Sequence, residues 1–165
     1  MSVLEDILRS YRAPRHVVRG YLAQPRSEPQ AFGLLLAALA FVFIAQWPGL
    51  SRFAINHADT PLFALLLGQA FGLLLAVPVL YVAAQIAHWV AKPFGGRGSA
   101  YRSRIALFWA LLAVSPVLLL RGLLYGLIGP SPQLTIANIL IFVIFLVIWL
   151  AGLRVAEFET EEPPR

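Results

Sequence analysis

The sequence predicts an all-α, polytopic membrane protein with four transmembrane helices, or five if the long second span contains a break. Composition is the first observation, because 59% of the 165 residues are apolar and only 13% are charged, whereas about a quarter of a soluble domain is charged. The second observation is that four segments are each long and apolar enough to cross a bilayer. The length suits one domain, and the absence of cysteine excludes disulfides and thiolate chemistry.

Residues 1–26 are predicted to form an amphipathic segment on the cytoplasmic surface of the membrane. Leu4, Ile7 and Leu8 share one helical face, and Pro14 separates this helix from a second short one. The alternative is a helix that packs against a cytosolic partner. The candidate lipid-binding or partner-binding residues of this segment are Arg9, Arg12, Arg15 and Arg19.

A transmembrane helical domain is predicted over residues 27–154, with spans at about 30–47, 61–90, 103–127 and 134–153. Pro48 and Gly49 are expected to end the first span. The second span is longer than the bilayer core, so it must tilt, kink or protrude. Residues 155–165 are predicted to form an acidic, disordered tail.

The second and third spans mirror each other about Arg97, at the centre of a basic, glycine-rich turn. Pro78 and Pro116 lie equally far from Arg97, which predicts kinks at a common depth. Each span also carries a GxxxG motif, which allows helix backbones to approach closely. The matched motifs predict a contact between these two spans, with a second subunit as the alternative. Their residues are Gly68, Gly72, Gly122 and Gly126.

Orientation follows from the basic residues. Eleven of the 13 lysines and arginines lie in the N-terminal segment, the glycine-rich turn or the C-terminal region. Because positive residues remain on the cytoplasmic side, both termini and the turn are predicted there. The arginines flank apolar spans, where anionic lipid headgroups attract them, so nucleic acid is not expected as a partner.

No catalytic or metal site is predicted, and no cofactor is expected. No aspartate or glutamate lies within a predicted span, which argues against a proton-coupled transporter. His57 and His88 fall on opposite sides of the membrane and cannot share a metal ion. Asp59 and Arg121 are a candidate ion pair near the outer interface.

The glycine-rich turn is interpreted as a tight turn rather than a phosphate loop. It lacks the lysine and serine that end a P-loop. The alternative interpretation is that the basic residues around the turn bind a lipid headgroup. The candidate residues are Arg97, Arg102 and Arg104.

Several elements of the turn and third span carry a family resemblance. They are Gly95-Gly96-Arg97-Gly98-Ser99, Tyr101, Arg104, Phe108-Trp109 and Ser115-Pro116. Through them the chain resembles the Yip1-domain family of multi-spanning membrane proteins, best over residues 92–116. The resemblance implies a helical membrane protein, typically with five spans, and the bacterial members imply the inner (cytoplasmic) membrane. The Asp-Leu-Tyr-Gly-Pro signature of the eukaryotic members is absent, so their binding of Rab-type GTPases is not carried over.

The leading functional hypothesis is a non-enzymatic inner-membrane scaffold or adaptor. It would bind anionic lipid headgroups, or an unknown membrane or cytoplasmic protein, and it could associate as a homo-oligomer through its glycine faces. The alternative is a small oligomeric transporter or channel, in which the paired prolines would form a hinge or a vestibule.

Overall fold

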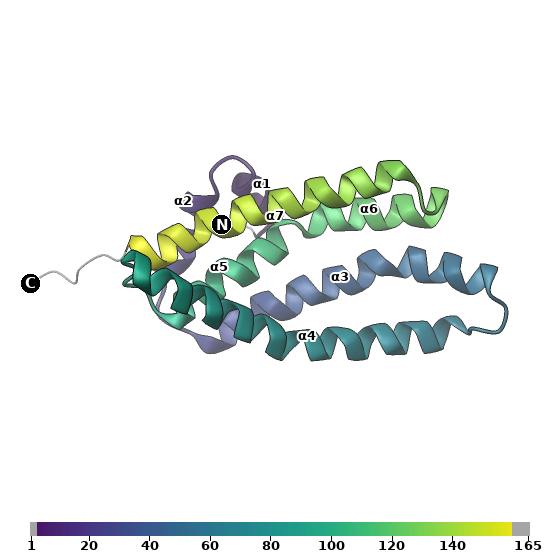
Figure 1. Cartoon of the computed structure of the whole chain (residues 1–165), viewed down its shortest axis with the longest axis horizontal. Coiled ribbons are helices and arrows are strands. Elements are labelled where there is room, and N and C mark those ends of the chain that lie inside the picture. Colours follow the sequence, from purple (N-terminus) through teal and green to yellow (C-terminus); the bar gives the residue numbers. More distant parts are fainter. Residues whose placement is uncertain (1–2, 160–165) are drawn as a thin grey trace, which may run out of the picture.

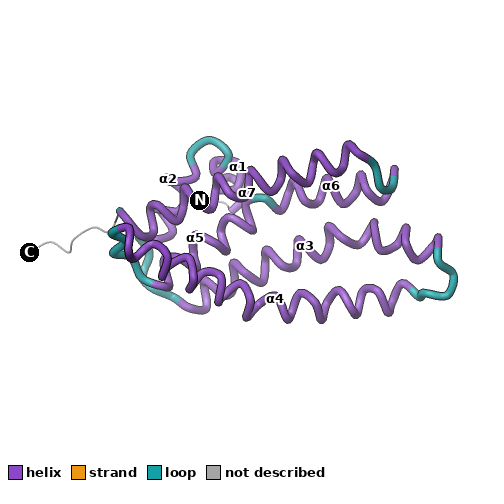
Figure 2. Tube along the Cα trace, viewed as in Figure 1, coloured by secondary structure: helices purple, strands orange, loops and turns teal. Residues whose placement is uncertain are grey.

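The computed structural model describes residues 3–159, which form helices joined by short connections, with no strand among them (Figure 1). Four stretches of these residues are long and apolar enough to cross a membrane, which confirms the predicted class (Figure 2). They are α3, α4 with η1, α5 with α6, and α7. In chain order the elements are α1 (Val3–Ser10), α2 (Pro14–Leu22), α3 (Glu28–Asn56), α4 (Leu62–Ala91), the short 3-10 helix η1 (Lys92–Phe94), α5 (Ala100–Ala113), α6 (Ser115–Ile128) and α7 (Pro132–Phe158).

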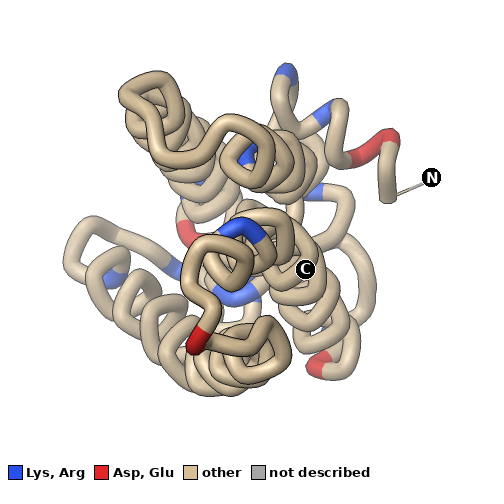
Figure 3. Tube along the Cα trace, turned by 90° about the vertical axis from the view of Figure 1, so that its right-hand side faces the viewer, with Lys and Arg blue, Asp and Glu red and all other residues tan. Residues whose placement is uncertain are grey.

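The bundle has two chemically different ends. The basic end carries α1, α2, η1 and the C-terminal end of α7, and the distal end carries the α3–α4 and α6–α7 connections (Figure 1). Between Arg104 and Arg121 the third span has no charged residue, a stretch of about 25 Å at 1.5 Å per residue. This length is close to the hydrocarbon thickness of a bilayer. Figure 3 looks onto the distal end and shows long uncharged stretches of helix.

Helix α3 is longer than the sequence predicts. It begins after Ser27, whose hydroxyl oxygen accepts a hydrogen bond from the Gln30 N–H, as an N-cap residue does. It then continues through Pro48 to Asn56 instead of ending at residue 47. The added turns are held in place because Arg52 donates to the carbonyl oxygens of residues 126 and 127 at the end of α6.

The break in the long spans lies in the third span, not in the second. Helix α4 is continuous through Pro78, so it contains no hidden boundary, and four rather than five stretches of residues 3–159 are long and apolar enough to cross a membrane. By contrast, α5 ends at Ala113 and α6 starts at Ser115, next to Pro116. Both matched prolines lack an N–H, but only Pro116 coincides with an interruption of its helix.

This interruption anchors the N-terminal helix. The Val117 N–H donates to the Val114 carbonyl rather than to that of Ala113. The Tyr11 hydroxyl donates instead to the freed Ala113 oxygen, at 2.8 Å. One turn away, Trp109 Nε1 donates to the hydroxyl of Ser10, at 2.9 Å. Helix α1 is therefore attached to α5 at two neighbouring points.

Helix α5 forms the centre of the core. Ile105, Phe108 and Trp109 are fully buried, and α5 packs against α2, α3, α4 and α7. Val18 of α2 is also fully buried and lies beside Gly152 of α7. The apolar face of α2 therefore contacts the bundle instead of lying on a lipid surface.

The predicted contact between the two GxxxG motifs is wrong. Gly122 and Gly126 of α6 face α3, where a Cβ on Gly122 would lie 1.7 Å from the Ala45 carbonyl oxygen. Gly68 and Gly72 of α4 have no other atom within 4 Å of a Cβ position. The close contact that glycine permits is thus between α3 and α6, which pack along their length.

Replacing Tyr11 by Phe is expected to destabilise the protein by about 1 kcal/mol, because the Ala113 carbonyl would lose its donor. Thermal unfolding of the detergent-solubilised full chain would measure the loss, and hydrogen exchange of residues 3–12 would show whether α1 detaches. Tyr125→Phe is the matched control, because the Tyr125 hydroxyl makes no hydrogen bond within residues 3–159. Equal effects of the two substitutions would contradict the anchoring role.

Candidate functional site

The glycine-rich turn docks onto the C-terminal end of α7. The backbone N–H groups of Arg97 and Gly98 donate to the Glu157 carbonyl oxygen, at 2.7 and 3.1 Å. Arg102 adds its side chain, with Nε 2.8 Å from the Ala156 oxygen and Nη2 3.2 Å from that of Glu159. The last carbonyl groups of a helix have no partner within the helix. The turn and Arg102 therefore cap α7.

The turn needs glycine for two different reasons. Gly95 has a φ of 89°, in the left-handed region where a side chain is strained. Gly98 has an ordinary φ but no room, since a Cβ would lie 2.2 Å from the Ala156 carbonyl oxygen. The predicted tight turn is thus also a close contact between two backbones.

Arg104 connects three helices. Its Nη2 lies 3.0 Å from Glu28 Oε1 of α3, and its guanidinium stacks over the Tyr81 ring of α4 with a centroid distance of 5.4 Å. Arg102 and Arg104 are thus occupied by internal contacts. Of the three predicted headgroup ligands in the turn, only Arg97 has a side chain without a polar partner among residues 3–159.

The basic end also contains a buried acid–base pair that sequence reasoning missed. His88 Nδ1 lies 2.9 Å from Glu157 Oε1, and the two side chains are 9% and 0% exposed. The second carboxylate oxygen, Oε2, has no hydrogen-bond partner in the described part of the chain. This pair joins α4 to the end of α7, beside the glycine-rich turn.

This pair was missed because the end of the last helix was predicted too early in the chain. The predicted disordered tail began at residue 155, but α7 continues to Phe158, and Val155 and Ala156 are fully buried. The available signal was that residues 153–156 contain no glycine or proline that would end the helix. The rest of the predicted tail, residues 160–165, lies outside the described residues.

The N-terminal helices present a basic surface, which we define as Arg9, Arg12 and Arg15. All three are exposed, and none of their side chains makes a polar contact with residues 3–159. Arg19, the fourth predicted residue, is paired with Glu159 at the end of α7. Leu4 and Leu8 of α1 are also exposed, at 68% and 72%.

A cleft of about 230 Å³ separates α1 from α2, beside the basic surface. Asp6, Arg9, His16 and Tyr21 are among the residues that line it. Burial, followed by the negative charge of Asp6 and a hydrogen bond to it, raises the pKa of Tyr21. The Tyr21 hydroxyl and the Asp6 carboxylate are thus hydrogen-bonded to each other in the cleft.

The proposed pair of Asp59 and Arg121 does not form. Arg121 Nε donates to Asn138 Oδ1 of α7 at 2.8 Å, and its guanidinium stacks over the Tyr125 ring at 5.1 Å. Arg121 faces α7 because α6 packs against α3 and α7. Proximity to the same membrane interface was therefore insufficient to identify the partner.

Residues 3–159 contain no group of three or more His, Cys, Asp or Glu side chains that could hold a metal ion. The three histidines lie on α2, after the end of α3, and on α4.

Comparison with known proteins gives one match. A family model described as the Yip1 domain matches residues 8–162, which is nearly the whole chain. Searches of curated proteins and of solved structures found no match.

Proposed function

The chain belongs to the Yip1-domain family of membrane proteins, and from this premise we propose that it is a non-enzymatic adaptor of the bacterial inner membrane. Its basic surface binds anionic lipid headgroups of the cytoplasmic leaflet, with both termini in the cytoplasm. A partner protein that carries acidic groups is the second ligand class for the same surface.

The observation that supports this proposal is that unpaired cations lie on helices that are packed against the bundle. Arg9, Arg12 and Arg15 have no polar partner among residues 3–159, while α1 is held against the bundle by the Tyr11 and Trp109 hydrogen bonds and α2 by the buried Val18. Each arginine near an anionic membrane surface contributes about 1 kcal/mol of attraction. Because these helices are ordered in advance, little conformational entropy is lost when a headgroup binds.

A transporter or channel within one chain has less support. The buried polar residues of the described chain lie near the basic end or, for Ser115, at the α5–α6 break. Apart from the Ser131 Oγ in the α6–α7 connection, no buried polar side chain of residues 3–159 lies in the distal part of the bundle, so these residues form no continuous polar path from one end to the other.

Neutralising the basic surface tests the adaptor proposal. We expect phosphatidylglycerol to raise the unfolding temperature of the detergent-solubilised full chain more than phosphatidylcholine does. A triple variant should lose most of this difference; its substitutions are Arg9→Gln, Arg12→Gln and Arg15→Gln. The wild-type stabilisation should weaken at high salt, because salt screens exposed charges. Thermal unfolding at low and high salt measures both effects.

Arg19→Gln is the control, because Arg19 is already paired with Glu159. It should retain the response to phosphatidylglycerol. An unchanged response in the triple variant would rule out the basic surface as the headgroup site.

A further inference from the structure

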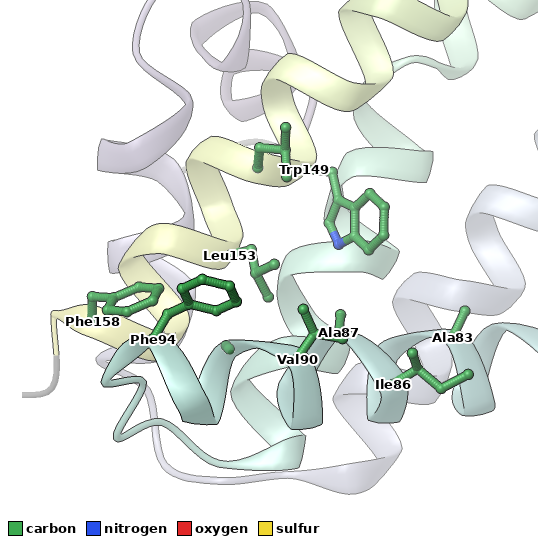
Figure 4. Close-up of a pocket in the computed structure, with 10 residues that line it drawn as sticks. Ala83, Ile86, Ala87, Val90, Phe94, Trp149, Leu153 and Phe158 are labelled. Atoms are coloured by element: carbon green, nitrogen blue, oxygen red, sulfur yellow. The ribbon is translucent and has the colours of Figure 1, made fainter.

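An apolar groove lies between α4 and α7 at the basic end of the bundle, apart from the basic surface on α1 and α2. It has a volume of about 530 Å³, and its exposed lining is entirely apolar. Figure 4 shows side chains from both helices pointing into it. The lining residues are Ala83, Ile86, Ala87, Val90, Ala91, Phe94, Trp149, Leu150, Leu153 and Phe158.

The shape of the groove follows from the sequence of α4. Ala83, Ala87 and Ala91 recur every four residues and so form one face of the helix. Because alanine side chains are small, they form the floor of the groove, and larger apolar side chains of α4 and α7 form its walls. The groove is long and narrow, since Ala83 and Ala91 are about 12 Å apart along the helix axis.

Two exposed cations are close in the fold to residues that line the groove. Arg154 of α7 is one turn from both Leu150 and Phe158, which line the groove, and it is exposed. Arg97 is bonded through its backbone to Glu157, next to Phe158. Neither side chain has a polar partner among residues 3–159. The nearby carboxylates are occupied, since Glu157 is paired with His88 and Glu159 with Arg19.

We propose that this groove binds one anionic phospholipid. An acyl chain occupies the apolar channel and the phosphate lies between Arg154 and Arg97. A phospholipid presents its phosphate and its acyl chain in this order. This site is independent of the basic surface and would persist if that surface bound no lipid.

Charge favours an anionic lipid over a transmembrane helix of a second protein as the occupant of the groove. Arg154 and Arg97 are exposed and have no polar partner among residues 3–159, which is what an anionic headgroup beside an apolar groove requires.

Native mass spectrometry of the full chain tests the proposal. The protein is reconstituted with equimolar palmitoyl-oleoyl phosphatidylglycerol and phosphatidylcholine, then washed at high salt to remove lipids held only by exposed charges. The wild type should retain about one phosphatidylglycerol per chain. Ala87→Phe, which fills the groove, should lower this occupancy about tenfold, whereas Ala64→Phe on the exposed distal part of α4 should not.

Arg154→Gln provides a second test that does not depend on groove packing. It should lower the ratio of bound phosphatidylglycerol to phosphatidylcholine about fivefold, the effect of one arginine near an anionic group. Wild-type occupancy in Ala87→Phe, or an unchanged lipid ratio in Arg154→Gln, would overturn the proposal. The proposal would also be overturned if the wild type formed an oligomer and the Ala87→Phe variant did not, because the groove would then be a protein interface.

Discussion

Gly122→Ala is expected to destabilise the protein by at least about 3 kcal/mol, at the upper end of the usual cost of overpacking. The added Cβ would lie 1.7 Å from the Ala45 carbonyl oxygen and 2.7 Å from its carbon. These are backbone atoms, so the clash cannot be relieved by a rotamer change. Helices α3 and α6 would have to separate along the most extensive contact in the bundle.

Thermal unfolding in detergent measures this loss, and Gly72→Ala is the matched control. Gly72 is also part of a GxxxG motif, but nothing lies within 4 Å of its Cβ position. Alanine there should be neutral or stabilise α4 by up to about 1 kcal/mol, because glycine is a poor helix former. If both substitutions destabilised the protein equally, the α3–α6 contact would not be the one that requires glycine.

The second large effect is expected at the buried pair. His88→Leu would leave the fully buried Glu157 carboxylate without its partner, and breaking a buried pair from one side costs about 3–5 kcal/mol. Glu157→Gln should cost less, because an amide oxygen can still accept from a neutral imidazole N–H. The double variant His88→Leu, Glu157→Leu should recover much of the loss, because no buried charge remains.

A double-mutant cycle by thermal unfolding separates these outcomes. The two single substitutions should be strongly non-additive, because the side chains are in direct contact. Additive losses would show that each side chain is held by other groups. Hydrogen exchange at residues 95–98 gives a second measurement, since the backbone of Glu157 accepts two hydrogen bonds from this turn.

The candidate site could be predicted only in part from the sequence. The arginines of α1 and α2 were chosen because charge beside an apolar span is a local property, and their binding role stays a prediction. Arg102 and Arg104 were expected to bind lipid, yet they cap α7 and pair with Glu28. Their partners come from residues 28 and 155–159, and no local pattern places those residues beside the turn.

The sequence by itself determined the class of the protein, the four apolar stretches and the ends that carry charge, but it left open whether the second stretch contains a break. These properties depend on the length of each apolar stretch and on the charges beside it, and both can be read along the chain. Only the tertiary structure decided that Gly122 rather than Gly72 is a contact, that Arg121 bonds Asn138, and that His88 pairs with Glu157. The physical reason is that lipid and protein interior are equally apolar, so the pattern along a span does not show which face contacts a neighbouring helix.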